Sequence, residues 1–259
     1  MKVAVLGAGG MLGRMVLDVL AREKGLEVLA SARGRALAGA AKAAYPDVAW
    51  RELDAETASV ADIGAVIEGA DCVVNCIGLI KQRFDDTDAS EVERAILVNA
   101  LFPQRLGRAA RVAGARVLQI ATDCVYSGAR GSYVETDPHD ALDVYGKTKS
   151  LGECRSGAVS SLRCSIVGPE LDGGPSLLEW FLSQPRGARL NGFTNHRWNG
   201  VTTLHFAKLC AGIVKSGLKP GSLRHVVPGD SVTKHELLTL FARAYGREDV
   251  VIAPVAAPT

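Results

Sequence analysis

The chain has 259 residues, of which 47% are apolar and 22% are charged, and its formal net charge is +2. This balance predicts a packed globular protein, with one large domain or one domain and a smaller lobe, and it argues against a disordered or coiled-coil chain. Basic and acidic residues are interspersed, so the sequence indicates neither a nucleic-acid-binding surface nor a polybasic membrane patch.

The N-terminus and the cysteines indicate the compartment. The first predicted strand begins at residue 2, which leaves no room for a signal peptide, and no apolar run reaches the ~18 residues that span a bilayer. None of the six cysteines forms a CxxC pair, which favours buried, reduced thiols over disulfides or zinc ligands. We therefore expect a cytoplasmic protein without a metal site. The cysteines are Cys72, Cys76, Cys124, Cys154, Cys164 and Cys210.

The beginning of the chain carries a pattern typical of dinucleotide binding. A predicted buried strand at 2–6 leads directly into a glycine turn and then into an amphipathic helix at 11–23. Gly7 permits the tight turn, Gly10 lets backbone amides approach a pyrophosphate, and Gly13 lets the helix pack closely on the strand. The helix N-terminus adds partial positive charge. The predicted cofactor-binding residues of this turn are Gly7, Gly9, Gly10, Met11, Leu12 and Gly13.

The residues after the second predicted strand, at 27–32, bear on the choice of cofactor. An NAD site usually places Asp or Glu there to bind the ribose hydroxyls. Here the segment reads Ser31-Ala-Arg33-Gly-Arg35, without an acid. A guanidinium pairs well with a 2′-phosphate, so we expect NADP(H) to be preferred and NAD(H) to remain possible. The alternative is that both arginines are solvated loop residues.

The alternation of strands and helices continues along the chain. Asp54 follows a third strand at 48–53 and is placed to hydrogen-bond an adenine. A fourth strand at 71–78 ends in Cys76, Ile77 and Gly78, which we expect to lie along the cofactor. Helices are predicted at 60–68 and at 91–113, and Pro103 should kink or split the second of them.

A fifth strand at 115–121 delivers Thr122, and a helical segment follows with Tyr145 and Lys149. Four residues make about one helical turn, so these two side chains share a face. A Lys ammonium near a phenol lowers its pKa from about 10. Tyr145 is therefore predicted to transfer a proton while the Thr122 hydroxyl binds the same substrate oxygen.

The fold class predicted from this alternation is α/β, a Rossmann-type doubly wound parallel sheet with a smaller C-terminal substrate-binding lobe. Ligands bind such sheets beyond the carboxyl ends of the strands, where all these candidates lie. We place the Rossmann domain at 1–168 and the mixed α/β lobe at 169–259, with a soft boundary that allows interleaving. After a sixth strand at 161–167, the expected elements are helices at 176–183, 202–216 and 233–245 and a strand at 223–227.

With these residues in view, the chain resembles the extended short-chain dehydrogenase/reductase superfamily, and within it the dTDP-4-dehydrorhamnose reductase-like branch. The likeness rests on Gly7-x-x-Gly10-x-x-Gly13, Thr122-Asp-Cys-Val-Tyr-Ser-Gly128, Tyr145-Gly-Lys-Thr-Lys149-x-x-Gly-Glu153 and Arg163-Cys-Ser-Ile-Val-Gly168. The resemblance implies that Tyr145 donates a proton to a sugar keto oxygen and that Lys149 lowers its pKa and holds the nicotinamide ribose. Thr122 would polarise the carbonyl, Asp123 would orient the sugar, and Asn99 would be the cofactor-side Asn.

The substrate residues are less clear, because this chain departs from the family where an aromatic-rich stretch usually follows Thr-Asp. Tyr126 is the candidate there. Arg197 is a candidate for the pyrophosphate of a nucleotide, against the alternative of a surface Arg. Trp198 is a candidate for the sugar site, although packing is the more common role for such a residue.

The resemblance, together with these residues, implies an NAD(P)H-dependent reductase of a nucleotide-linked 4-keto sugar. Two alternatives stay open: an epimerase or dehydratase of the same superfamily, and a non-catalytic NADP-binding regulatory subunit. Cys124 instead of a second acid after Asp123 argues against dehydration. Retention of Thr122, Tyr145 and Lys149 argues against a regulatory subunit. The long helix at 91–113 allows a homodimer.

Overall fold

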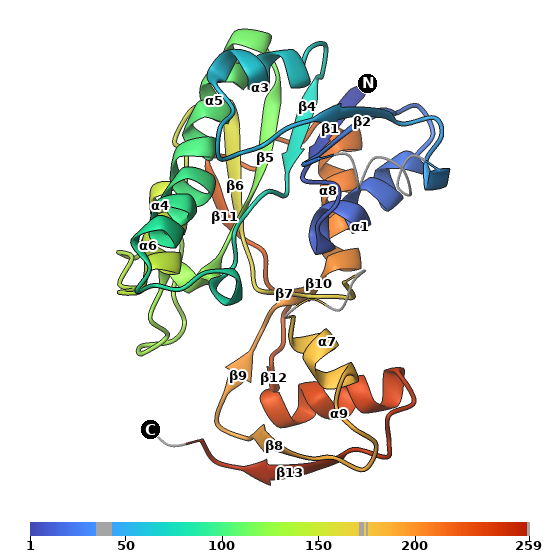
Figure 1. Ribbon diagram of the computed structural model, residues 1–259, viewed down its shortest axis with the longest axis vertical. Helices are drawn as coiled ribbons and strands as arrows, with labels where there is room; N and C mark the ends of the chain where they lie inside the picture. Colours follow the sequence, from blue (N-terminus) through green and yellow to red (C-terminus); the bar gives the residue numbers. More distant parts are fainter. Residues whose placement is uncertain (35–42, 171–173, 175, 258–259) are drawn as a thin grey trace. The chain divides into compact units, whose positions relative to one another are not determined.

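A computed structural model describes residues 1–34, 43–170, 174 and 176–257 (Figure 1). The described chain forms two compact units. The first unit consists of Met1–Cys164 and Thr203–His225, and the second of Ser165–Thr202 and Val226–Thr259. Residues 203–225, which the predicted division placed in the lobe, therefore belong with the sheet, and the chain passes between the units three times.

The first unit is built on a parallel sheet, as predicted. Within the described residues, seven strands pair in the order β11-β6-β5-β4-β1-β2-β3, and every pair is parallel. The order reverses direction between β1 and β4, which is the switch point of a doubly wound sheet. The strands are β1 Lys2–Leu6, β2 Glu27–Ala32, β3 Ala49–Glu52, β4 Cys72–Asn75, β5 Arg116–Ala121, β6 Val159–Arg163 and β11 Leu223–His225.

Helices cover both faces of this sheet, so its central strands β1 and β4 read as nearly continuous apolar runs. Figure 1 shows α1 (Met11–Ala21) and α8 (Thr203–Ser216) on one side and α3 (Val60–Val66), α5 (Phe102–Ala113) and α6 (Val144–Leu151) on the other. Short 3-10 turns, η1 (Lys81–Arg83) and η3 (Asp123–Val125), follow β4 and β5. One core joins strands and helices through the buried residues Leu6, Leu29, Ile63, Ile67, Val73, Phe102, Leu106 and Val117.

The predicted long helix is present but not uniform. It begins as α4 (Ala89–Ala95), becomes a π-helix at η2 (Ile96–Leu101) and continues as α5. Pro103 lies in the first turn of α5, directly after the π segment. A proline lacks the N–H that an α-helix interior requires and is tolerated in the first turn of a helix, which is where Pro103 lies. The chain therefore changes its helical hydrogen bonding here and stays helical.

The second unit has its own small core. β7 (Ile166–Val167) pairs with β10 (Val201–Thr202), β9 (Arg197–Trp198) with β12 (Val232–Thr233), and β8 (Arg189–Phe193) with β13 (Val251–Val255). α7 (Leu177–Leu182) and α9 (Lys234–Ala244) supply Phe181 and Phe241, whose ring centroids are 5.9 Å apart. The sequence analysis predicted β6 and β7 as one strand and missed β8, β9, β10, β12 and β13. These strands have two residues or an interior Gly or Pro, and such strands carry little periodicity.

Candidate active site

The turn after β1 has the geometry that the glycine pattern predicted. Gly7 has φ +76°, a conformation that favours glycine, and a Cβ on Gly13 would lie 2.1 Å from the Gly7 carbonyl oxygen. Gly10 differs, because it is exposed and a Cβ there would meet nothing closer than the Gly7 oxygen at 3.5 Å. Close packing against Gly7 therefore explains why position 13 is a glycine. At Gly10, the N-terminus of α1 is open to a ligand. Gly9 and Met11 are half-buried, and Leu12 is buried in the core.

The segment after β4 lies against Asn99 and Lys149. Asn99 is buried in η2, accepts from the Leu79 backbone N–H at 2.8 Å and donates to the Leu79 oxygen at 2.8 Å. A Cβ on Gly78 would lie 3.6 Å from Lys149 Nζ and 3.7 Å from Asn99 Oδ1. Ile77 lies over Gly7, and Cys76 is half-buried beside it in sequence. The structure thus brings Gly78, Asn99 and Lys149 together, with the Asn99 amide engaged by backbone.

Lys149 is a buried ammonium with free hydrogen-bonding capacity. It is 8% exposed, and among the described residues its Nζ makes one hydrogen bond, to the Ile120 carbonyl at 3.2 Å. Burial lowers the pKa of Lys149 to about 8, an effect that the nearby Cys164 and Glu153 oppose. An ammonium has three donors, so two of them have no partner among the described residues.

Tyr145 contradicts one expectation. Lys149 was predicted to lower the pKa of the phenol, whereas burial raises it well above its usual range, and the nearby Cys124 adds to the rise. A hydrogen bond with Thr122 opposes this rise. The reason is that neighbouring protein atoms desolvate the phenol, although Tyr145 as a residue is only half-buried, and the Lys149 ammonium is directed at the Ile120 carbonyl. Tyr145 is protonated at neutral pH, as an ordinary phenol is, and burial makes it a weaker acid than the sequence analysis expected.

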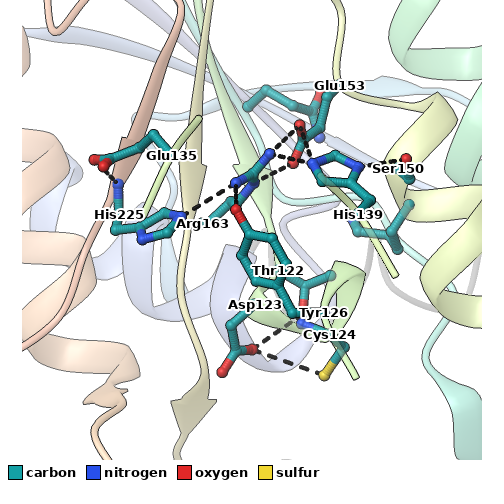
Figure 2. Close-up of polar contacts among 12 residues, drawn as sticks. Thr122, Asp123, Cys124, Tyr126, Glu135, His139, Ser150, Glu153, Arg163 and His225 are labelled. Atoms are coloured by element: carbon teal, nitrogen blue, oxygen red, sulfur yellow. Dashed lines mark hydrogen bonds and ion pairs between the residues drawn. The ribbon is translucent and has the colours of Figure 1, made fainter. Parts of the chain in front are cut away.

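Thr122 and Asp123 complete this group at the end of β5. The Thr122 oxygen accepts from the Cys124 N–H at 3.1 Å and its hydroxyl donates to Asp123 Oδ1 at 3.4 Å, which holds the turn η3 (Figure 2). Asp123 as a residue is exposed, yet neighbouring protein atoms desolvate its carboxylate and raise its pKa. Thr122, Tyr145 and Lys149, the residues predicted to act together, all lie in the first unit beside the carboxyl end of β5.

Two glycines that the sequence analysis did not assign determine where α6 lies. Asp143 caps the helix by accepting from the Gly146 N–H at 2.7 Å. A Cβ on Gly146 would lie 2.6 Å from the Cys124 oxygen, and one on Gly152 would lie 1.9 Å from the Asn99 oxygen. These approaches bring the Tyr145 helix against both η3 and η2. Both glycines stand in the motif that carries Tyr145 and Lys149, but spacing alone gives no sign of their partners.

The adenosine end of the predicted site contains an acid that the sequence analysis overlooked. The exposed Arg33 donates through Nη1 to Glu56 Oε1 at 3.1 Å, and Arg94 Nε donates to the same oxygen at 2.7 Å. Glu56 follows the third strand, not the second, so a search of the segment after β2 does not find it. Asp54 accepts from the Glu56 N–H at 2.9 Å, which uses one carboxylate oxygen in its own turn. Arg35 lies outside the described residues.

Tyr126 occupies a buried polar cluster. It is 9% exposed, its hydroxyl donates to the Val134 oxygen at 2.9 Å and accepts from Arg163, and its ring stacks on Tyr133. Figure 2 shows Arg163 at the centre of this cluster, with Glu153, His139 and His225 around it. The substrate site proposed below therefore does not include Tyr126. The cluster had no signal in the sequence beyond Tyr126, Glu153 and Arg163 standing in family-like motifs.

The remaining substrate candidates belong to the second unit. Arg197 is exposed and donates to Ser231 Oγ through Nε at 3.0 Å. Trp198 donates through Nε1 to Ser165 Oγ at 2.7 Å and packs against the core of that unit. Among the described residues, no helix is long and apolar enough to cross a membrane. All six cysteines are free thiols. Within residues 1–34, 43–170, 174 and 176–257, no cluster of His, Cys, Asp or Glu is arranged to hold a metal ion.

Comparison with known proteins identifies relatives of this chain. The model of the family described as RmlD substrate binding domain matches residues 1–167. A dTDP-4-dehydrorhamnose reductase of Mycobacterium tuberculosis is 30% identical over 159 residues, covering 59% of this chain and 44% of the relative. Another, from Streptomyces griseus, is 33% identical over 150 residues, covering 58% and 42%. The chain thus spans less than half the length of these curated relatives.

Solved structures show the same fold along nearly the whole chain. A dTDP-4-dehydrorhamnose reductase from Clostridium acetobutylicum has a TM-score of 0.76 at 21% identity, covering 99% of this chain and 84% of that one. The corresponding protein from Bacillus anthracis, in complex with NADP, has a TM-score of 0.73 at 16% identity, covering 99% and 84%. A UDP-glucuronic acid 4-epimerase from Bacillus cereus, in complex with NAD, has a TM-score of 0.76 at 14% identity, covering 98% and 86%. Reductases and epimerases therefore share this architecture.

Proposed function

Because this chain belongs to the RmlD substrate binding domain family, we propose that it is an NAD(P)H-dependent reductase of a nucleotide-linked 4-keto sugar. The observation that carries the proposal is the meeting of Thr122, Tyr145 and Lys149 beside the end of β5, at the rim where the glycine turn also opens. The curated relatives are dTDP-4-dehydrorhamnose reductases, which supports the substrate class.

The residues present fit a nicotinamide cofactor. Gly10 leaves the N-terminus of α1 open for a pyrophosphate, and the two free donors of Lys149 beside Gly78 suit the hydroxyls of the nicotinamide ribose. When bound, this cofactor supplies the hydride. Asn99 holds the segment with Ile77 and Gly78 in place through the backbone of Leu79.

The side chains of the protein supply the proton and the polarisation of the carbonyl. Tyr145, which carries its proton at neutral pH, donates it to the sugar keto oxygen as the carbonyl is reduced. The Thr122 hydroxyl donates a second hydrogen bond to that oxygen, where negative charge develops. The Lys149 ammonium adds positive charge on the same face of α6. Asp123, next to Thr122, is assigned to orienting the sugar. Arg197, for the pyrophosphate, and Trp198, for the sugar, stay predictions.

We assign the preferred cofactor as NADPH on the basis of Arg33. Its guanidinium is 60% exposed in an ion pair with Glu56, so it can turn toward a 2′-phosphate at modest cost. Glu56 is the competing feature, because a carboxylate in this region would favour ribose hydroxyls and thus NADH.

The test is the oxidation of NADPH or NADH by the purified protein with a panel of nucleotide-linked 4-keto sugars, followed at the nicotinamide absorbance. Tyr145→Phe should lower kcat by ~10²–10⁴-fold and leave cofactor affinity nearly unchanged, because the phenol acts on the sugar. Tyr245→Phe, which changes an exposed phenol in the second unit, is the matched control. Full turnover by Tyr145→Phe would remove this residue as the acid.

The second candidate function is an epimerase on the same scaffold, favoured by the fold that the chain shares with the Bacillus cereus epimerase. An epimerase returns the hydride within each turnover, so it would convert the sugar without net oxidation of NADPH. Product analysis of the same reactions separates the two functions. Bound cofactor without any product would instead indicate the regulatory-subunit alternative.

A further inference from the structure

The most deeply buried charge outside the predicted catalytic group belongs to Arg163, the last residue of β6. Arg163 is 2% exposed and is the largest fully buried side chain of the described residues. Burying a guanidinium costs several kcal/mol unless it is paired and hydrogen-bonded. Glu153 provides the pairing, because Arg163 Nε donates to Oε1 at 2.6 Å and Nη2 donates to Oε2 at 2.8 Å. This bidentate contact orients the plane of the guanidinium.

The other guanidinium hydrogens are also taken. Nη1 donates to the Tyr126 hydroxyl and lies 3.1 Å from His225 Nε2, and Nη2 contacts His139 Nε2. A guanidinium only donates, so both imidazoles accept through Nε2 and carry their proton on Nδ1. His139 Nδ1 then lies 2.5 Å from Ser150 Oγ and donates to it. Four side chains are thus arranged around one rigid cation (Figure 2).

Two of these partners, Glu153 and Tyr126, come from the segments that carry the predicted catalytic group, and His139 adds a contact to the same helix through Ser150. Ser150 is adjacent to Lys149 in α6, and Glu153 lies one turn beyond Lys149. On the other side, Tyr126 ends the turn η3 that begins after Thr122, and its N–H donates to the Asp123 oxygen at 3.0 Å. One guanidinium therefore connects the helix of Tyr145 with the turn of Thr122, although neither residue touches it.

We propose that Arg163 is a positioning residue, which holds η3 and the end of α6 at the separation that lets the Thr122 hydroxyl and the Tyr145 phenol act on one substrate oxygen. This inference rests on the proposed reductase function. The planar guanidinium suits the role because its donors have fixed directions, which a flexible ammonium lacks. A misplacement of about 1 Å in a reacting group costs ~10²-fold in rate, so a loosened connection should appear in kcat.

Tyr126→Phe tests the proposal without removing the buried charge. The substitution deletes the hydroxyl that Arg163 contacts and keeps the ring that stacks on Tyr133, with centroids 4.3 Å apart. We expect kcat to fall at least ~10-fold with the KM for NADPH nearly unchanged. The deuterium isotope effect on kcat from deuterated NADPH should rise as hydride transfer becomes more rate-limiting.

Tyr133→Phe is the matched control. It also removes a phenol hydroxyl of the same stack, one that contacts Ser127 and Asp140 and does not contact Arg163. If both variants keep the parental kcat well below their Tm, Arg163 stabilises the fold and positions nothing. If Tyr126→Phe raises the KM for the sugar at unchanged kcat, Tyr126 contacts substrate, and the positioning role is refuted.

A second variant, Glu153→Gln, addresses the other half of the connection. It preserves the shape of the side chain, removes its charge and should lower kcat in the same way. Turnover by the unsubstituted protein separates the two proposals. If the unsubstituted protein turns over no sugar, the reductase function is refuted, and the positioning role of Arg163 with it. If the unsubstituted protein is active and Tyr126→Phe, Tyr133→Phe and Glu153→Gln all keep its kcat, the positioning role alone is refuted.

Discussion

The buried charge of Lys149 should lower the free energy of unfolding of the protein, and Lys149→Met tests this. Lys149 is 8% exposed, and its pKa falls from an ordinary 10.5 to about 8 because burial disfavours the ammonium. That difference corresponds to about 3 kcal/mol of unfavourable free energy in the folded state, at about 1.4 kcal/mol for each tenfold change. Methionine has similar length and no charge, so it removes this term.

The net gain in the free energy of unfolding is smaller than the full value of about 3 kcal/mol. The substitution also removes the hydrogen bond from Nζ to the Ile120 carbonyl, worth about 1 kcal/mol. That carbonyl is not left unpaired, because Gln119 Nε2 also donates to it at 2.9 Å. We therefore expect the free energy of unfolding to rise by about 2 kcal/mol at pH 7, while reductase turnover is lost.

The pH dependence identifies the cause. The folded protein releases the Lys149 proton near pH 8 and the unfolded chain holds it up to about 10.5, so the penalty is full below pH 8 and vanishes as pH rises through 10.5. Denaturant unfolding at pH 7 and pH 9.5 measures this, with the variant compared with the parent at each pH. The stabilisation should shrink to less than half at pH 9.5. Lys147→Met, an exposed position of the same helix, is the control. An equal stabilisation at both pH values, or none at pH 7, would refute the reasoning.

Two further predictions concern the cofactor end and the packing of the site. Arg33→Ala should weaken NADPH binding by ~10- to 100-fold, as for loss of a charge-assisted contact, and change NADH binding little. Glu56→Gln should tighten NADPH binding. Titration with both cofactors measures this, and equal weakening of both by Arg33→Ala would show that Arg33 does not recognise the 2′-phosphate. Gly152→Ala should destabilise by about 1–3 kcal/mol in denaturant unfolding, because its Cβ would lie 1.9 Å from a backbone oxygen of Asn99. Gly157→Ala, where nothing lies within 4 Å, should stay within about 0.5 kcal/mol, and similar values for the two variants would contradict the packing argument.

The local patterns of the sequence were sufficient for the frame of the site. The strand, glycine turn and helix at the N-terminus, the Thr122 that follows β5 and the one-turn spacing of Tyr145 and Lys149 were all read from short segments. Such features depend on periodicity and on residues that are neighbours in the chain, which is what a sequence displays directly. The doubly wound parallel sheet followed from the same alternation and is confirmed.

Contacts between distant residues were decided by the tertiary structure. Arg33 meets Glu56 after a different strand, Gly152 meets the backbone of Asn99, and α8 returns to the sheet after a passage through the second unit. The pKa of Tyr145 belongs here too, because helical spacing places a lysine near the phenol but does not say how much water either group loses. Arg163 shows the limit most clearly: a basic residue at the end of a strand predicts solvent exposure, and here its partners, from 10 to 62 residues away in sequence, make it the centre of a buried cluster.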